Sequence, residues 1–469
     1  MDADPGLDRI LVGRHPSRKD APPIMPAARL LRFAALCVAA SAPLDAARRT
    51  AGAELLSAAH AGIRATDAGR HVAVLADDSF EGREGGSRGG HAAGSYIVEQ
   101  LQPLGLEPAG DDGSCFQRFG QLRNILVLLR GSDPRLEREL VVVGAHYDHV
   151  GYGKPANSFG PFGMVHNGAD DNASGVAGLL EIAAAVQQLS TPPRRSILLA
   201  FWDGEEQGLL GSRHFLRVRP LSVAGMRIVF SVNLDMIGRL RDRRLEVFGT
   251  RSASGLRSAV VAANNDPANA AGLDLFFDWD CDEDSDHYPF IHAGVPTVMF
   301  HTGLHDQYHR PADDVHLVNL DGIEPVSRLA LGFLRSIADA DAVPAFRPQA
   351  LGESNASRRG LELVATDAVA TPRGRWGIVT RADPAEPAAP VVVRVAPGSP
   401  ASAGGMLPGD RLLAIDGASV AGQDDMVARL KAAATEVSID IERRGRFAEL
   451  RLRSPEPAME RDGHRSGGN

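Results

Sequence analysis

The chain has 469 residues, 44% hydrophobic and 23% charged, with a formal net charge of -9 at pH 7. This length exceeds one ordinary core, so two or three domains are expected. The composition excludes a mainly disordered chain, and the acidic balance gives no electrostatic basis for binding nucleic acid. The cysteines Cys37, Cys115 and Cys281 form no CxxC or Cys/His motif, so a metal site must use oxygen and imidazole ligands. A Cys115–Cys281 disulfide and two buried thiols are both compatible with this pattern.

Residues 1–42 are predicted to hold a secretory signal. Arg29 and Arg32 precede a short apolar run, and the sequence ASA at 40–42 offers small residues for cleavage. Translation would then start at Met25, and the alternative is a frayed N-terminal helix. The signal predicts a periplasmic or secreted protein. No segment of the sequence is long and apolar enough for a stable membrane span.

Residues 43–340 are predicted to form an α/β domain. Near-continuous apolar runs, typical of strands buried on both faces, begin near Asn124, Leu140, Ser196, Ile228 and Pro296. Helical patterns alternate with them, and the helix from Ser174 has the apolar stripe Val176, Leu179, Leu180, Ala183 and Val186. Asn172 or Ser174 can cap its first turn. This alternation favours a mostly parallel, mixed sheet sandwiched by helices.

Histidines and acids follow four of these strands. They are His146, the pair Glu205 and Glu206, Asp235, and His309, and Asp170 lies in the acidic turn before the helix. In open α/β sheets, ligands bind at the carboxyl ends of the strands. Two divalent ions about 3.5–4 Å apart need a shared carboxylate and further ligands on each side. The sequence therefore predicts a two-metal site with three carboxylates and two imidazoles as ligands.

The motifs GAHYDHVG, GADDNASG, DGEEQGLLGS, NLDMIG, SDHYPF and YHRPADD follow one another in this order. Together they resemble the zinc exopeptidase family of di-zinc aminopeptidases over residues 70–340. The resemblance implies the zinc exopeptidase (phosphorylase/hydrolase-like) fold, two Zn²⁺ ions, and removal of N-terminal residues from a peptide or protein substrate. It places His146 and Asp235 on one zinc, Glu206 and His309 on the other, and Asp170 between them. Asp171 is the alternative bridge.

Three further residues are expected to serve catalysis. Glu205 is the expected general base, Asp148 is placed to orient His146, and Tyr308 matches a residue that helps hold the oxyanion in some family members. Other residues are expected to be packed, exposed or pocket-lining: His149, His166, His292, His301, His305, Asp286 and His287. Three alternative functions stay open at this point. They are a glutaminyl cyclase-like acyl transferase, a carboxypeptidase-type relative and a non-catalytic scaffold whose working part is the C-terminal domain.

The composition changes after residue 340. Residues 341–372 are polar with prolines and predict a linker, residues 373–454 predict a small β-rich domain, and residues 455–469 predict a disordered tail. The run APGSPASAGGMLPGDRLLAIDG resembles the PDZ domains of bacterial envelope proteases. The resemblance implies that Trp376, Gly377 and Ile378 form a loop that binds a peptide C-terminus or a partner protein. A packing domain with a blocked groove is the alternative.

Overall fold

The computed structural model describes residues 59–189, 191–362 and 374–454. The predicted signal region, part of the predicted linker and the predicted tail lie outside these residues. No helix in the described ranges is long and apolar enough to cross a membrane. Cys115 and Cys281 are both free thiols, so the disulfide is absent from this structure.

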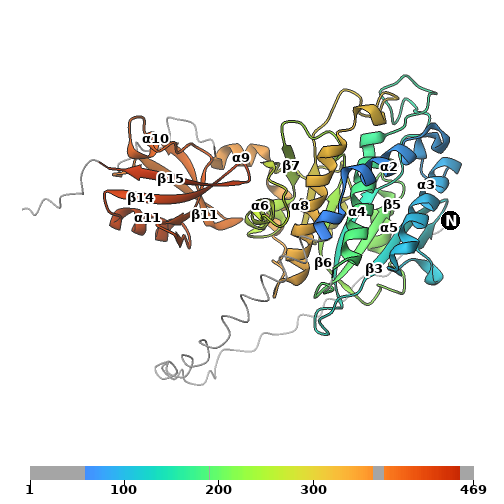
Figure 1. Ribbon diagram of the computed structural model, residues 1–469, viewed down its shortest axis with the longest axis horizontal. Helices are drawn as coiled ribbons and strands as arrows, with labels where there is room; N and C mark the ends of the chain where they lie inside the picture. Colours follow the sequence, from blue (N-terminus) through green and yellow to red (C-terminus); the bar gives the residue numbers. More distant parts are fainter. Residues whose placement is uncertain (1–58, 190, 363–373, 455–469) are drawn as a thin grey trace, which may run out of the picture. The chain divides into compact units, whose positions relative to one another are not determined.

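A nine-stranded mixed sheet forms the centre of the first domain (Figure 1). Its strand order is β1-β3-β5-β4-β6-β9-β7-β8, and β2 pairs with β3. The bounds are β1 Glu107–Pro108, β2 Phe116–Phe119, β3 Leu122–Leu129, β4 Glu139–His146, β5 Ser196–Trp202, β6 Arg227–Leu234, β7 Arg244–Phe248, β8 Asp274–Phe277 and β9 Thr297–His301. The neighbours β5, β4, β6 and β9 run parallel, whereas β3 and β7 pair antiparallel to them. The predicted mixed α/β architecture is confirmed.

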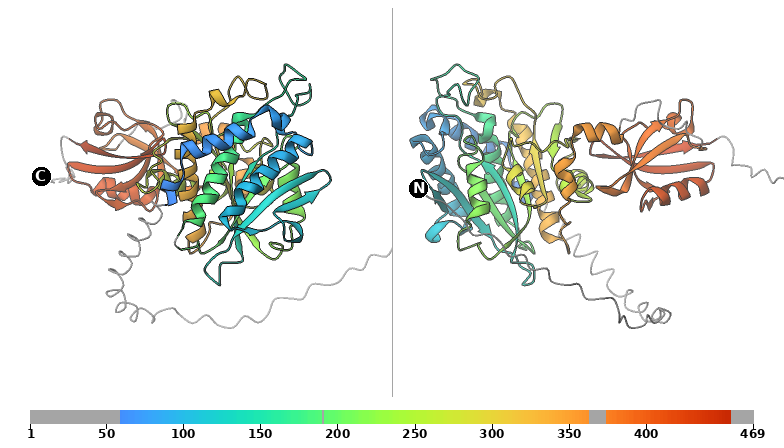
Figure 2. Two further views of the ribbon diagram at one scale, coloured as in Figure 1. Left: turned by 45° about the vertical axis from the view of Figure 1, so that its right-hand side comes forward. Right: turned by 180° about the vertical axis from the view of Figure 1, so that it is seen from behind.

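Both faces of the sheet are buried, which explains the continuous apolar strands. In β4, Val141 and Val143 face one core cluster, whereas Leu140 and Val142 face the other. The helices contributing to the first cluster are α2 Ala65–Leu75, α3 Arg88–Leu101, α4 Gly175–Gln187, α6 Leu256–Asn265 and α8 Leu320–Asp339. Figure 2 shows α2, α3 and α4 side by side over this face. The second cluster takes Phe215 from α5 Leu210–Arg217 and Phe290 from α7 His287–His292.

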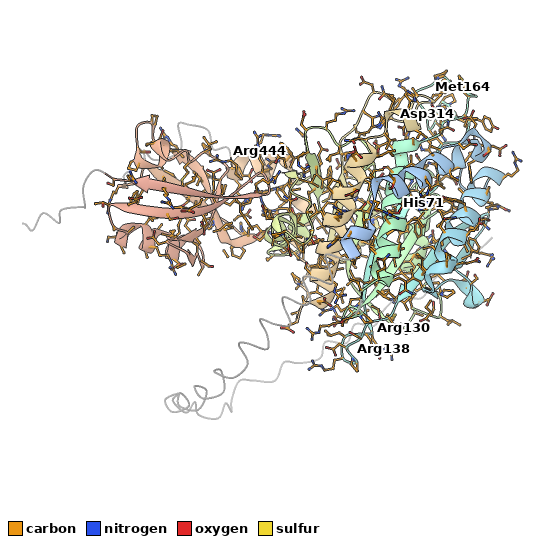
Figure 3. The ribbon with its side chains drawn as sticks, viewed as in Figure 1. His71, Arg130, Arg138, Met164, Asp314 and Arg444 are labelled. Atoms are coloured by element: carbon orange, nitrogen blue, oxygen red, sulfur yellow. The ribbon has the colours of Figure 1, made fainter. Side chains whose placement is uncertain are left out.

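The loops after the parallel strands gather at one end of the domain. Met164, from the loop after β4, and Asp314, from the loop after β9, lie at this end in Figure 3. Arg138, just before β4, lies at the opposite end. Because parallel strands end at a common edge, residues that follow β4, β5, β6 and β9 converge there.

The C-terminal domain is a six-stranded antiparallel sheet with two helices. Its strand order is β10-β11-β12-β14-β15, and β13 pairs with β12. The bounds are β10 Ile378–Asp383, β11 Glu386–Val395, α10 Pro400–Ala403, β12 Arg411–Ile415, β13 Ala418–Ser419, α11 Gln423–Ala432, β14 Glu436–Arg443 and β15 Arg446–Arg453. The predicted linker contains a short helix, α9 Asn355–Glu362.

Candidate metal centre

The site begins at the last residue of β4. His146 is 2% exposed, and its Nε2 lies 3.4 Å from Asp171 Oδ1 and 3.4 Å from Asp235 Oδ1. Asp235 directly follows β6, and its other oxygen accepts a hydrogen bond from the Ser285 hydroxyl at 2.6 Å. His146, Asp171 and Asp235 thus form one group of candidate metal ligands.

A second group lies on the other side of Asp171. The His309 Nε2 atom lies 3.1 Å from Asp171 Oδ2 and 3.2 Å from Glu206 Oε2. His149 Nδ1 lies 2.8 Å from Glu206 Oε1. These four residues form the second group of candidate ligands. Asp171 is common to both groups, with one carboxylate oxygen directed to each.

Asp170, the predicted shared carboxylate, belongs to neither group and has other partners. Asp170 Oδ1 accepts hydrogen bonds from the Gly238 amide at 2.6 Å and from the Ser174 hydroxyl at 3.0 Å. Its Oδ2 lies 3.3 Å from His305 Nε2. The Asp170 carboxylate therefore stabilises the turn after β6. Asp171, whose backbone is extended (φ -100°, ψ 98°), faces His146 and His309 instead.

The loop that carries Asp171 is held by buried ionic groups. Asp313 Oδ2 accepts from the amides of Asp170 and Asp171, each at 3.0 Å, and its Oδ1 accepts from Arg239 at 2.9 Å. Arg83, which is 1% exposed, donates to the carbonyls of Tyr147, Asn167 and Gly168. One guanidinium thus joins the two segments that carry His146 and Asp171. The helix after this loop is capped by Asn172, whose Oδ1 accepts from the Gly175 amide at 3.0 Å.

Asp148 connects the histidine with the acidic loop after β5. Its carboxylate accepts from the amides of Glu205 at 3.0 Å and Glu206 at 3.4 Å. His146 Nδ1 lies 3.2 Å from the Asp148 carbonyl oxygen and 3.9 Å from its carboxylate. The imidazole is therefore oriented by the main chain of Asp148, while its side chain positions the loop of Glu205.

The buried carboxylates and imidazoles of the site favour binding of cations. Burial disfavours a protonated His309, but the nearby carboxylates of Asp171 and Glu206 raise its pKa to about 10. Burial opposes ionisation of Glu206, yet hydrogen bonds from His149 and His309 lower its pKa. Among the described residues, Asp171 Oδ2, Asp235 Oδ1 and His149 Nε2 are buried without a hydrogen-bond partner. Buried carboxylates and imidazoles in this state fit divalent ions such as zinc.

Glu205 and Tyr308 line the cavity beside these groups. Burial raises the pKa of Glu205, and the carboxylates of Glu206, Asp286 and Asp235 raise it further. Burial also raises the pKa of Tyr308, so its phenol remains a hydrogen-bond donor. Its ring stacks on His309 with centroids 3.9 Å apart. Both groups therefore lie beside the candidate metal ligands.

Residues that were not predicted as ligands differ in their positions relative to the site. His149, expected to be packed or exposed, contacts Glu206, and the sequence signal was its place three residues after His146. His301, together with Glu246 and Asp284, lines the cavity. Their strands and loops carry no motif that would mark them. His287 is buried against Phe248, and His166 is held by Ser158 and the Met164 carbonyl.

The loop predicted to bind a peptide C-terminus lies in the second domain. Trp376 is 4% exposed, belongs to the core of that domain and donates from Nε1 to the Leu430 carbonyl at 2.7 Å. Ile378 packs against the same core. Gly377 has a φ of 72° and donates to the Gly374 carbonyl at 3.0 Å. Of the three residues, Trp376 thus supports the fold.

Comparison with known proteins identifies both domains. Residues 124–334 match the model of peptidase family M28, and residues 391–443 match a PDZ domain. Aminopeptidase YwaD of Bacillus subtilis is 29% identical over 198 residues, which cover 41% of this chain and 39% of that relative. Leupeptin-inactivating enzyme 1 of Streptomyces exfoliatus is 25% identical over 240 residues, 50% of this chain and 47% of that relative. The chain thus spans less than half the length of these two relatives.

One further relative and one solved structure are also similar to this chain. Leucine aminopeptidase 1 of Trichophyton equinum is 26% identical over 279 residues, covering 55% of this chain and 71% of that relative. The crystal structure of the LapA aminopeptidase from Legionella pneumophila superposes with a TM-score of 0.52 at 19% identity. It covers 61% of this chain and 75% of that one, and at this identity it supports the fold alone.

Proposed function

Because this chain carries a peptidase family M28 domain followed by a PDZ domain, we propose that it is a zinc-dependent aminopeptidase. Its substrates would be peptides, from which it removes N-terminal residues. The position of Asp171 carries this proposal. One oxygen faces His146 and Asp235, and the other faces Glu206 and His309, which is the arrangement that two neighbouring ions require.

Zinc ions held by these residues would polarise the scissile carbonyl and lower the pKa of a water molecule. Glu205 is the group placed to accept a proton from that water and to return it to the leaving amine. The Tyr308 phenol donates a hydrogen bond to the oxygen on which negative charge develops. The Asp148 carboxylate accepts a hydrogen bond from the Glu205 amide and so holds Glu205 in place. His149 keeps Glu206 in place through its 2.8 Å contact.

The test uses the full-length protein and leucine 4-nitroanilide. We expect release of 4-nitroaniline that stops with 1,10-phenanthroline and returns with zinc. Glu205→Gln should keep two metal equivalents, measured by mass spectrometry of the elements, and lose activity by about 10²–10⁴-fold. Turnover near that of the wild type in this variant would refute Glu205 as the base.

Export and peptide binding belong to the same proposal. The basic and apolar pattern of residues 25–42 supports export to the periplasm or medium, and a mature N-terminus near Pro43 in that fraction would test it. The PDZ domain supports recruitment of a peptide C-terminus or a partner protein. Its strand β10 ends the order of the sheet, so one edge can pair with a peptide.

A further inference from the structure

A cavity of about 230 Å³ adjoins the metal centre. Part of its wall is apolar, formed by Met236, Phe248, Met299 and Leu304. Neither lysine nor arginine occurs among the residues that line it, whereas six carboxylates do. The chemistry of the proposed function accounts for Asp171, Glu205, Glu206 and Asp235. Two carboxylates, Glu246 and Asp284, have no role in it.

Glu246 lies on β7, opposite His301 of β9. Its charged partner is Arg244 at 3.1 Å, a side chain that is 52% exposed. Exposed pairs of this kind contribute little, so Arg244 can yield to a ligand. His301 Nδ1 is 3.9 Å from Glu246 and accepts a hydrogen bond from the Gly303 amide at 2.8 Å. While it accepts this bond, Nδ1 does not donate to Glu246. Burial lowers the pKa of His301, but Glu246, Asp235 and Asp170 raise it above its usual value.

Asp284 lies in the segment 278–286, which contains six carboxylates. Its nearest basic group is His287 Nε2, at 3.9 Å. Burial lowers the pKa of His287 to about 4, so this ring is neutral at pH 7. No lysine or arginine among the described residues forms an ion pair with Asp284. Its side chain is 58% exposed, so its carboxylate adds a partly solvated negative charge to the cavity wall.

Building on the proposed aminopeptidase function, we propose that this cavity receives the side chain of the N-terminal residue and selects lysine or arginine. The apolar wall would contact the methylene stem of such a side chain, which is itself apolar. Glu246 and Asp284 would bind its cationic end. A neutral aliphatic residue could make the first set of contacts but would pair with neither carboxylate, which favours the basic substrate.

The experiment compares lysine 4-nitroanilide with norleucine 4-nitroanilide, because the two differ only in the terminal ammonium group. We expect kcat/KM of the wild type to favour lysine by about tenfold or more, as for a partly desolvated charge pair. Glu246→Gln and Asp284→Asn should each lower this ratio about threefold to tenfold, through the lysine substrate alone. Glu283→Gln is the matched control. It removes an exposed carboxylate from the same segment, outside the cavity wall, and should leave the ratio unchanged.

The outcomes distinguish failure of the proposed lysine selectivity from failure of the proposed aminopeptidase function. Hydrolysis without preference for lysine overturns the selectivity and leaves the aminopeptidase function standing. If Glu246→Gln and Asp284→Asn lower kcat/KM equally for both substrates, these carboxylates bind the α-ammonium group. This result would also overturn the proposed selectivity. If the zinc-loaded protein hydrolyses neither anilide, the proposed function fails. Calorimetry with lysinamide and norleucinamide then decides the pocket, and equal affinities refute it.

Discussion

The metal centre and the loop around Trp376 were both predicted from sequence motifs, yet their polar groups differ. In the metal centre, Asp171, Asp235 and His149 each have a buried polar atom without a hydrogen-bond partner among the described residues. In residues 376–378, the Trp376 indole, the Trp376 carbonyl and both main-chain groups of Gly377 have partners, although Nε of the preceding Arg375 is buried without one. Burying an unsatisfied polar group is costly. The first arrangement is therefore expected where a ligand completes the structure, and the second where the residues support the fold.

The largest effect is expected from exchanging the two neighbouring aspartates of the metal centre. Asp171→Asn removes the charge shared by both candidate sites, so it should lower metal content below two equivalents and activity by at least about 10³-fold. Asp170→Asn keeps an oxygen for the Gly238 amide and should retain both metals. Elemental analysis of the two purified variants checks this pair. Metal loss in Asp170→Asn with two metals in Asp171→Asn would reverse the assignment.

Trp376→Ala tests whether the buried indole stabilises the PDZ domain. The substitution removes a buried indole and its hydrogen bond to Leu430, and should cost about 3–5 kcal/mol of stability in the PDZ domain. Thermal unfolding and limited proteolysis of the full chain would show an earlier transition in this domain. Hydrolysis of leucine 4-nitroanilide should be unchanged. Undiminished stability with loss of peptide binding would instead support the loop residue as a ligand contact.

The preference for lysine over norleucine is expected to depend on pH through the charge of Asp284. Burial, Asp235 and Asp282 raise the pKa of Asp284 to about 6. Its carboxylate is charged above this pH and neutral below it, so the ratio of kcat/KM for lysine over norleucine should fall from pH 7.5 to pH 5. Taking the ratio cancels titrations that affect both substrates. The fall should be smaller in Asp284→Asn, and a flat ratio in the wild type would contradict the role of this carboxylate.

The smallest effect is expected at the free edge of β10. The Gln423 side chain on α11 donates to the Thr380 carbonyl at 3.3 Å, a long hydrogen bond worth at most about 1 kcal/mol. Gln423→Ala should free this carbonyl and tighten binding of a labelled hydrophobic peptide with a free C-terminus about twofold, measured by fluorescence anisotropy. The same peptide with an amidated end serves as the control. Weaker binding would mean that Gln423 is itself a peptide contact.

The sequence predicted the strands best where burial leaves little choice of residue. Strands β4 and β5 are apolar on both faces, and the acids and histidines that follow them mark the carboxyl edge of the sheet. The orientation of adjacent side chains could not be predicted in the same way. Asp170 and Asp171 are identical in type, and only the main-chain conformation between Gly168 and Ser174 decides which of them faces the histidines.

Other parts of the site depend on contacts distant in sequence. Glu246 reaches the cavity because β7 pairs with β9, and Asp284 lines it from the loop before α7. Trp376 matched a binding motif by position, but its burial follows from the packing of α11 and β14 residues around it. Motifs thus located both regions, whereas tertiary contacts determined what each residue does.

Anomalous diffraction from zinc-soaked crystals would show whether Asp171 joins two metal sites. We expect two peaks about 3.5–4 Å apart, one beside His146 and Asp235 and the other beside Glu206 and His309, with the Asp171 carboxylate between them. A single peak, or two peaks joined by Asp170, would contradict this expectation.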